Sequence, residues 1–436
     1  MKIVRIFRVT TILALCLVAA ARGVSSAQNR SVDGSIHFYQ EALKRNPRDG
    51  RTYYRLGDAY IQKARESGDP TYFNLAEQAL RKSLELAPRN SGALRHLAYV
   101  LYFRHEFDEA ASHAQKAIAL APLDSNAYGI LGDAYLETGR YRQAEQTYQQ
   151  MIGLRQDLYT YSRLSGLKNI RGDIGGAIAD LENAVAEGKG NGRPGEGVAW
   201  VQWQLGDEHF AAGHLGDAKT QYLNALETYP NYYRALAGLA QVSVAEKRYE
   251  EAIELYKRAI AVIPQPDYIA ALADVYKKIG RGEEAERQYA LVETIGYLSA
   301  LNKVLYNREL AYFYADHDMK LAEALNLAQQ ELAVRKDIYG YDVLAWALYK
   351  NGSFEEARNA MDQALVQGTK DARLFFHAGM IYYRLGETAK AKEFLARALA
   401  TNPNFHIFHA GLAERTLKEL NQQSSRVADN GKSNDY

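Results

Sequence analysis

Cysteine is almost absent from this sequence of 436 residues, in which Cys16 stands alone. One thiol excludes an internal disulfide and a zinc site built from cysteines. Proline is also scarce, with 9 residues, which excludes collagen-like and proline-rich low-complexity chains. An excess of one charge is missing too, because 53 Lys and Arg face 52 Asp and Glu. This balance gives no indication of a nucleic-acid-binding protein with a basic face.

Long apolar runs are missing except near the N-terminus. Three basic residues among the first eight precede a mostly apolar, uncharged run over 9–21, and small residues follow at 25–27. This order is typical of a secretory signal peptide. As a helix the run rises only about 20 Å, short of a bilayer core of roughly 30 Å. We therefore predict a signal peptide over 1–27, export to the periplasm or the extracellular space, and no membrane span after cleavage. An uncleaved anchor is the alternative.

What the sequence does contain is a repeat of about 34 residues. The string Leu-Gly-Asp-Ala-Tyr occurs at 56–60 and again at 131–135. An alanine within an acidic, amphipathic stretch serves as a landmark in each unit. It falls at Ala76, Ala110, Ala144, Ala177, Ala218, Ala252, Ala285, Ala324, Ala357 and Ala391. Seven of the nine steps between these alanines are 33 or 34 residues, which chance does not produce.

Each unit reads as two amphipathic helices, because apolar residues recur at i, i+3, i+4 and i+7 over two stretches of about 14 residues. Gly or Ala at the eighth position, as at Gly132 and Gly206, lets the paired helix approach closely. Short turns such as Thr138-Gly139-Arg140 end the first helix. One pair cannot bury its apolar face alone, so the units are expected to stack into a superhelix with a concave face.

This period and these positions resemble the tetratricopeptide repeat (TPR), and the resemblance to exported bacterial members of that family covers about 34–420. It implies an all-α, right-handed α-solenoid of about ten helical hairpins. An N-terminal half repeat would precede them and a capping helix over 405–420 would follow. Breaks in the period divide the chain further. We predict a first block over 34–187, a Gly-rich loop over 188–197, a second block over 198–295, a third block with the capping helix over 300–420, and a disordered tail over 421–436.

Catalytic chemistry is not evident. The stretch 190–195 matches G-x-G-x-x-G, but no strand precedes it and Pro194 stands where a phosphate-binding turn offers an N–H, so a flexible loop is the better interpretation. The ten histidines include no H-E-x-x-H. His406 and His409 could share a helix face, but no third ligand is evident nearby. We predict no enzyme, no cofactor and no metal.

The concave face is the predicted site. In TPR proteins positions 2, 5, 6, 9, 12 and 13 of each unit line the groove, and 14 of the sixty such positions here are aromatic. Rigid aromatic side chains dominate binding hot spots, although several could instead fill gaps between helices. The aromatic residues predicted to bind a partner are Tyr99, Tyr102, Trp200, Trp203, Phe210, Trp346, Tyr349 and Tyr383.

Position nine carries an aspartate in alternate units, at Asp58, Asp133, Asp207 and Asp274. TPR proteins that clamp a terminal carboxylate usually have Asn there, so that function is doubtful for this chain. The aspartates could accept hydrogen bonds from a peptide, from Lys or Arg, or from sugar hydroxyls. Equally, they could bond locally between neighbouring helices.

The resemblance implies a non-enzymatic scaffold or adaptor of the cell envelope that binds a peptide or protein segment in its groove. The alternative is a glycan-binding component of a polysaccharide synthesis or export system, because aromatic rings stack on sugars. We expect a protein partner, with a polysaccharide as the second choice, and no nucleic acid. The oligomeric state stays open.

Overall fold

The computed structural model describes residues 31–190, 195–301 and 307–432, apart from the side chains of 299–301 and 424–432. Within those ranges the chain forms helices and no strand. The predicted signal peptide lies outside the described residues, as do 191–194 of the predicted Gly-rich loop. None of the described helices combines the length and the hydropathy of a membrane span.

The helices follow one another in chain order with short turns between them. They are α2 (Val32–Arg45), α3 (Gly50–Ser67), α4 (Thr71–Leu86), α5 (Ser91–Phe103), α6 (Phe107–Leu120), α7 (Ser125–Glu137), α8 (Tyr141–Leu154), α9 (Leu158–Ile170), α10 (Ile174–Gly190), α11 (Glu196–Ala211), α12 (Leu215–Thr228), α13 (Tyr233–Ala245), α14 (Tyr249–Val262), α15 (Pro266–Lys278), α16 (Gly282–Leu301), α17 (Asn307–Asp316), α18 (Leu321–Val334), α19 (Ile338–Lys350), α20 (Phe354–Ala364), α21 (Ala372–Arg384), α22 (Thr388–Thr401) and α23 (His409–Lys432).

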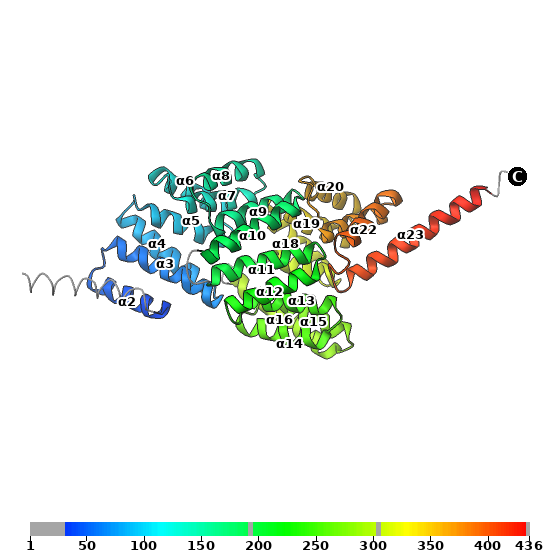
Figure 1. The fold of residues 1–436 in the computed structure, drawn as a ribbon, viewed down its shortest axis with the longest axis horizontal. Coiled ribbons are helices and arrows are strands. Elements are labelled where there is room, and N and C mark those ends of the chain that lie inside the picture. The colour runs from blue at the N-terminus through cyan, green and yellow to red at the C-terminus, as the bar shows by residue number, and fades with distance from the viewer. Residues whose placement is uncertain (1–30, 191–194, 302–306, 433–436) are drawn as a thin grey trace, which may run out of the picture.

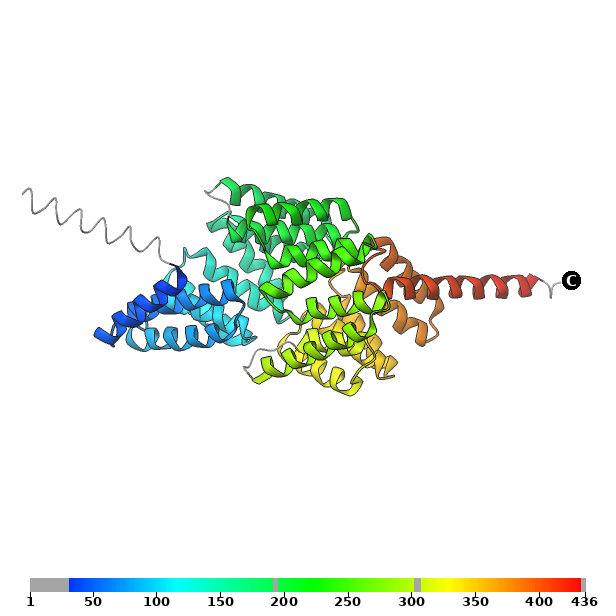
Figure 2. The ribbon, with the colours of Figure 1, turned by 90° about the horizontal axis from the view of Figure 1, so that it is seen from below.

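Twenty of these helices pair into ten hairpins, from α3 with α4 to α21 with α22. The single helix α2 precedes them as a half repeat, and α23 follows as a cap. The predicted all-α solenoid is therefore confirmed. Figure 1 shows the hairpins from α3 at one end to α22 at the other, with α23 extending away from the body. Figure 2 shows the first hairpins (blue) at one end, the middle hairpins (green) along one side, and the later hairpins (yellow and orange) on the other side.

Small residues set the distance within each hairpin, as predicted. All ten landmark alanines are at most 1% exposed. A Cβ on Gly132 of α7 would lie 2.2 Å from the Tyr148 ring of α8, which is closer than atoms can approach. Gly206 of α11 faces the Tyr222 ring of α12 in the same way, at 2.5 Å. The glycines therefore make room for large residues of the partner helix. The core consists of several clusters along the stack, the two largest over 32–167 and 236–420.

Helix ends follow local chemistry. The Asp49, Asp157, Asp337 and Asp371 side chains accept backbone N–H groups and begin α3, α9, α19 and α21. Inside the hairpins, turns such as Gly139 reach φ +71°, a left-handed conformation that favours glycine.

The helices form two layers. Most odd-numbered helices contact the next odd-numbered helix, as α5 contacts α7 and α17 contacts α19. The even-numbered helices instead contact mainly their odd-numbered neighbours. Closer spacing on one side bends the stack toward that side. The odd-numbered helices therefore form the concave inner face and the even-numbered helices the outer layer.

Several boundaries differ from expectation. Of the predicted Gly-rich loop over 188–197, residues 188–190 belong to α10 and 196–197 belong to α11. The first unit has seven residues more than the others, over 65–71, and we expected them to lengthen its inter-helix turn. They mostly extend α3 to Ser67 instead, and the turn before α4 spans only 68–70. The expected limit between the second and third blocks falls inside α16. The cap helix continues to Lys432, where we expected it to end at 420 with a disordered tail over 421–436. No proline or glycine occurs between 420 and Gly431 to end it. The division into three blocks stays a prediction.

Candidate functional site

The inner face is enclosed because distant turns of the chain touch. The Tyr141 hydroxyl at the start of α8 accepts the backbone N–H of Ile338 at 2.8 Å, 197 positions further on. A Cβ on the neighbouring Gly139 would lie 2.3 Å from the backbone oxygen of Lys336. The turn inside the third hairpin thus packs on the junction between the eighth and ninth.

The same relationship recurs along the chain. A Cβ on Gly172 would lie 2.4 Å from the Gly368 oxygen. The Asn402 side-chain amide donates to the backbone oxygen of Phe210 at 2.8 Å. In each case a turn inside one hairpin meets a junction five hairpins later. We call these contacts the seam, and they consist of Tyr141 with Ile338, Gly139 with Lys336, Gly172 with Gly368, Phe210 with Asn402, and Gly68 with Ile263.

A buried charge network strengthens the seam at its centre. The Arg335 guanidinium lies 2.9 Å from the Glu137 carboxylate, and Arg308 lies 2.7 Å from Asp337. Both arginines also contact Glu331, whose side chain is 0% exposed. Burial raises the pKa of Glu137 and of Asp337. Such a network is costly to leave half paired, so it fixes how the two turns meet.

The position-nine aspartates mostly follow the local alternative. Asp133, Asp207 and Asp274 each accept a hydrogen bond from the tyrosine fifteen residues on, at 2.7 to 2.8 Å. Those tyrosines belong to the second helix of the same hairpin. In the first unit the seven extra residues place Leu80 at the equivalent position, and the Asp58 side chain is 48% exposed.

Two of the three hydrogen-bonded aspartates have a further partner. Arg163 of α9 donates to both oxygens of Asp133, at 2.8 to 3.0 Å. His317 lies 2.7 Å from Asp274. Asp207 has no ion pair within the ranges that the structure describes, and burial raises its pKa to about 7.

The predicted aromatic residues divide into three groups along the chain: a first group of Tyr99 and Tyr102, a central group of Trp200, Trp203 and Phe210, and a last group of Trp346, Tyr349 and Tyr383. In the first, Tyr99 packs on Phe103 with ring centres 4.7 Å apart, and the Tyr102 hydroxyl donates to Glu137 of the seam network at 3.0 Å. In the last, Trp346 is 1% exposed and donates its indole N–H to Asp316, so it stabilises the wall and offers no surface to a partner.

The rest of the last group is half-buried. The Tyr349 ring stacks on Trp346 at 4.8 Å, and Tyr383 packs on the C-terminal part of the core. Neither side chain is fully enclosed, so both stay candidates for partner contact, unlike Trp346.

The central group combines three aromatic residues of one helix. Trp200, Trp203 and Phe210 all come from α11 and are half-buried. The Tyr159 ring lies 6.3 Å from Trp200, and its side chain is 37% exposed. On the other side, the Arg234 guanidinium lies over the Trp203 ring at 4.7 Å. Successive inner helices therefore bring aromatic and charged side chains together at this point.

Apart from the predicted Asp207, carboxylates of the inner face were missed by the sequence interpretation. Five form no ion pair with Lys, Arg or His among the residues described: Asp207, Glu208, Asp267, Glu309 and Asp371. Burial raises the pKa of each. The carboxylate of Asp371, which caps the start of α21, raises the pKa of Glu208 on α11 further.

The sequence contains a signal for two of these residues, Asp267 and Glu309. Position two of the repeat lies on the inner face, and in the last seven units it is always aromatic or charged. The residues at that position are Tyr159, Trp200, Arg234, Asp267, Glu309, Tyr339 and Arg373. We define the central patch as Tyr159, Trp200, Trp203, Arg234 and Asp267.

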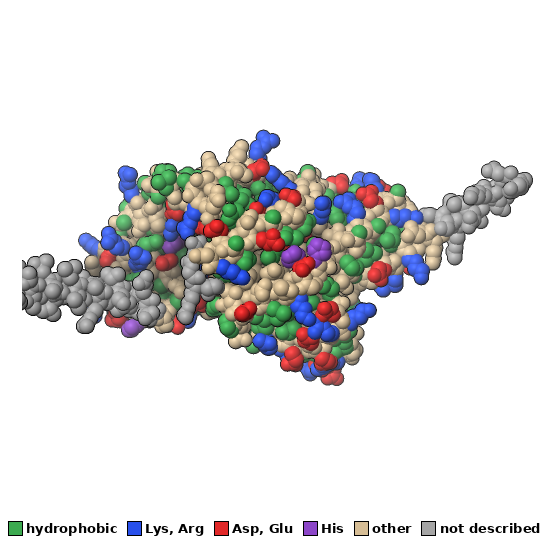
Figure 3. All heavy atoms as spheres, viewed as in Figure 1, with side chains coloured by type: hydrophobic (Ala, Val, Ile, Leu, Met, Phe, Trp, Pro, Cys, Tyr) green, Lys and Arg blue, Asp and Glu red, His purple; other side chains and the backbone are tan. Residues whose placement is uncertain are grey.

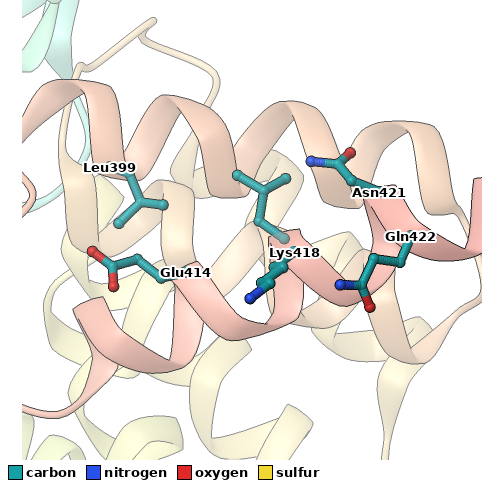
Figure 4. Close-up of a pocket in the computed structure, with 6 residues that line it drawn as sticks. Leu399, Glu414, Lys418, Asn421 and Gln422 are labelled. Atoms are coloured by element: carbon teal, nitrogen blue, oxygen red, sulfur yellow. The ribbon is translucent and has the colours of Figure 1, made fainter.

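Two hollows lie at the ends of the stack, away from the central patch. The C-terminal one, of about 450 Å³, lies between α22 and α23 with Leu399 and Leu417 among its lining residues. Figure 4 shows Glu414 and Lys418 of α23 beside it. The N-terminal one, of about 1010 Å³, is lined by Arg51, Arg55 and Arg89 with Tyr54. The sequence predicted neither.

The charge distribution on the outer surface does not indicate a further binding site. Acidic and basic side chains alternate over the face shown in Figure 3, with no field of one sign. Nor does any serine or threonine hydroxyl bond to a histidine in the part of the chain that the structure describes. Two histidine–aspartate groups could hold a metal: His209, His214 and Asp217, and Asp316, His377 and His409.

Comparison with known proteins identifies the same type of repeat. Family models described as tetratricopeptide repeat match residues 104–168, 204–268 and 343–404. A TPR repeat-containing protein of Methanocaldococcus jannaschii is 21% identical over 84% of this chain and 59% of its own length. A protein O-mannosyl-transferase of Homo sapiens is 26% identical over 42% of this chain and 22% of its own length.

The chain thus spans just over half of the archaeal relative and about a fifth of the transferase. Among solved structures, yeast Tom70 is 13% identical over 96% of this chain and 99% of its own, with a TM-score of 0.39.

Proposed function

This chain is a tetratricopeptide repeat protein, and from that premise we propose that it is a non-enzymatic scaffold that binds a segment of another protein along its inner face. The segment carries basic and apolar side chains, and the central patch is where it docks. In this proposal the protein serves as an adaptor in the cell envelope, reached through the predicted signal peptide.

One observation carries the proposal: accessible aromatic rings and unpaired carboxylates occur together on the inner face. Tyr159 lies beside Trp200, and Arg234 lies over Trp203. The Asp267 side chain is accessible from the inner face, yet the surrounding helices desolvate it enough to raise its pKa. Aromatic rings supply contact area at a low entropy cost. A carboxylate in a poorly solvated place gains most from a cationic partner, because the pair relieves the cost of burying the charge.

The sign of the charge favours a basic segment. The five unpaired carboxylates share the inner face with Arg234 and Arg373, and these two arginines already lie over the rings of Trp203 and Tyr312. Burial raises the pKa of Asp267 although both arginines oppose that shift. Lys or Arg of a bound segment would supply the missing positive charge.

A pair of designed peptides tests this function. One alternates lysine and leucine over twelve positions, and the other replaces each lysine by glutamate. We expect the lysine peptide to change the tryptophan fluorescence of the purified chain and to bind at least tenfold more tightly. Trp203→Ala and Asp267→Asn should each weaken that binding, while Glu254→Gln, on the outer helix α14, should not.

Equal binding of both peptides, or binding untouched by Trp203→Ala, would contradict the proposed site. A panel of glycans belongs in the same experiment. If the chain binds a saccharide but neither peptide, and Trp203→Ala removes that binding, the polysaccharide alternative is favoured. Fractionating cells tests the location, and full-length protein retained in the cytoplasm would speak against an envelope role.

A further inference from the structure

Three side chains far apart in the sequence converge near the C-terminal end of the inner face. Asp316 ends α17, His377 lies in the middle of α21, and His409 begins α23. Each offers one possible ligand atom within 4.8 Å of the other two. His409 Nε2 lies 4.0 Å from Asp316 Oδ1. The sequence indicated no third ligand beside His406 and His409, because Asp316 and His377 come from other repeats.

His377 is held so that one ring nitrogen stays free. Its Nδ1 lies 2.9 Å from Asp342 Oδ1, and both side chains are 0% exposed. The Tyr312 hydroxyl donates to the other oxygen of Asp342 at 2.6 Å. A carboxylate can only accept here, so Nδ1 carries the proton and Nε2 presents a lone pair. Within the described residues that buried Nε2 has no hydrogen-bond partner, and such an atom calls for an explanation.

The other two ligands are equally prepared. Asp316 Oδ1 accepts the Trp346 indole N–H at 2.7 Å, and no Lys or Arg forms an ion pair with Asp316 in the described ranges. The His409 ring is fixed between His406, with centres 4.1 Å apart, and Phe376, at 4.8 Å.

We propose that Asp316, His377 and His409 bind one divalent transition-metal ion, with zinc the best match to two imidazoles and one carboxylate. The Asp342–His377 bond is the kind of second contact that orients a metal-binding histidine. A tetrahedral zinc site with bonds of about 2.0–2.1 Å needs ligand atoms about 3.3 Å apart. Each atom must therefore move by less than about 1 Å, which rotation of these side chains can provide.

Bound metal would tie the cap helix to the inner layer. The three ligands belong to the eighth hairpin, the tenth hairpin and α23. A fourth coordination position stays open, as in metal sites with three protein ligands. The second group, His209, His214 and Asp217, lies on the surface with two exposed members. Among the residues that the structure describes, no carboxylate hydrogen-bonds to its histidines in the way that Asp342 does to His377.

Cobalt(II) titration of the full chain, prepared without a histidine tag, tests the site. We expect one equivalent to bind with the visible absorption of a tetrahedral ion, and zinc to displace it. His409→Gln and Asp316→Asn should each weaken binding at least tenfold, and Asp316→Asn keeps an oxygen for Trp346. His214→Ala, the matched change in the surface group, should bind as the unchanged chain does.

Two results overturn the proposal. One is absence of the tetrahedral spectrum, and the other is a spectrum lost in His214→Ala but kept in His409→Gln. Circular dichroism confirms that each variant is folded. If His409→Gln fails to fold, Asp316→Asn alone decides, and unchanged binding in that variant rejects the site.

Discussion

The Arg335 guanidinium lies 2.9 Å from the Glu137 carboxylate, which joins the junction before the ninth hairpin to the end of α7 in the third. Both side chains are largely enclosed, with exposed fractions of 15% and 17%. An ion pair in such a place resists loss of one partner far more than a surface pair does. The enclosed inner face therefore depends on a few contacts between residues that the repeat pattern keeps far apart.

Arg335→Met should destabilise the chain strongly. It leaves Glu137 with only the Tyr102 hydroxyl as a partner among the described residues, and it removes one of two arginines from the buried Glu331. Breaking a buried pair costs about 3–5 kcal/mol. Urea unfolding followed by circular dichroism measures this loss, and small-angle scattering should show a larger radius of gyration.

Arg248→Met is the matched control. Arg248 also has two acidic partners, Glu246 and Glu251, but its side chain is 39% exposed. Surface pairs contribute about 0–1 kcal/mol. Equal losses in the two variants would mean that the seam network does not hold the turns together.

Gly139→Ala should open the seam. The new Cβ would lie 2.3 Å from the backbone oxygen of Lys336, so the two turns must separate. Gly352→Ala is the control, because Gly352 has φ +86° but the described part of the chain places no atom of another residue against the added Cβ within 4 Å. Both variants pay for the left-handed backbone, about 1–2 kcal/mol. Only Gly139→Ala should also enlarge the radius of gyration, and a similar enlargement in both would contradict the role of the seam.

The repeat made most of the fold predictable. Ten hairpins follow from ten landmark alanines, because helix periodicity and the close packing within a hairpin depend on residues fewer than about forty positions apart. The Asp–Tyr hydrogen bonds could also have been predicted from the sequence. Asp133, Asp207 and Asp274 each have a tyrosine fifteen positions on, while the first unit has Leu80 at the equivalent place.

The seam and the histidine cluster could not be predicted in this way. Tyr141 meets Ile338 because of how far the superhelix turns per hairpin, and no single repeat encodes that angle. Trp346 shows why one predicted binding residue was wrong. Its repeat position lies on the inner face, yet the rings of His377 and Tyr349 cover it, with ring centres 4.2 and 4.8 Å away.

Removing the tyrosine hydroxyl from an Asp–Tyr pair should lower the free energy of unfolding more when the aspartate has no other partner. Tyr222→Phe takes away the side-chain hydrogen bond that Asp207 receives, whereas after Tyr148→Phe the Asp133 carboxylate keeps both bonds from Arg163. We expect losses of about 1–3 kcal/mol for Tyr222→Phe and under about 1 kcal/mol for Tyr148→Phe. Thermal unfolding of the two variants side by side measures the difference, and the reverse order would contradict it.

The pH dependence of stability should change in Asp207→Asn. Burial raises the pKa of Asp207 from 3.8 to about 7 in the folded chain. The folded state therefore binds this proton more tightly than the unfolded state. The stabilisation that protonation provides is complete below pH 3.8 and is lost as the pH rises through about 7. Asparagine cannot ionise and still offers an oxygen to Tyr222, so it resembles the protonated form at every pH.

Because of this, Asp207→Asn and the unchanged chain should unfold alike near pH 4, and the variant should be the more stable one at pH 8. The shift sets an upper limit of about 4 kcal/mol, and water reaching the partly exposed carboxylate reduces the expected gain to about 1–2 kcal/mol. Other carboxylates titrate in both proteins and cancel in the difference between their unfolding curves. A variant that is less stable at pH 8 would mean that the charged form of Asp207 is paired in the folded chain, and the inner face would then lack the unsatisfied carboxylate that a basic segment is proposed to meet.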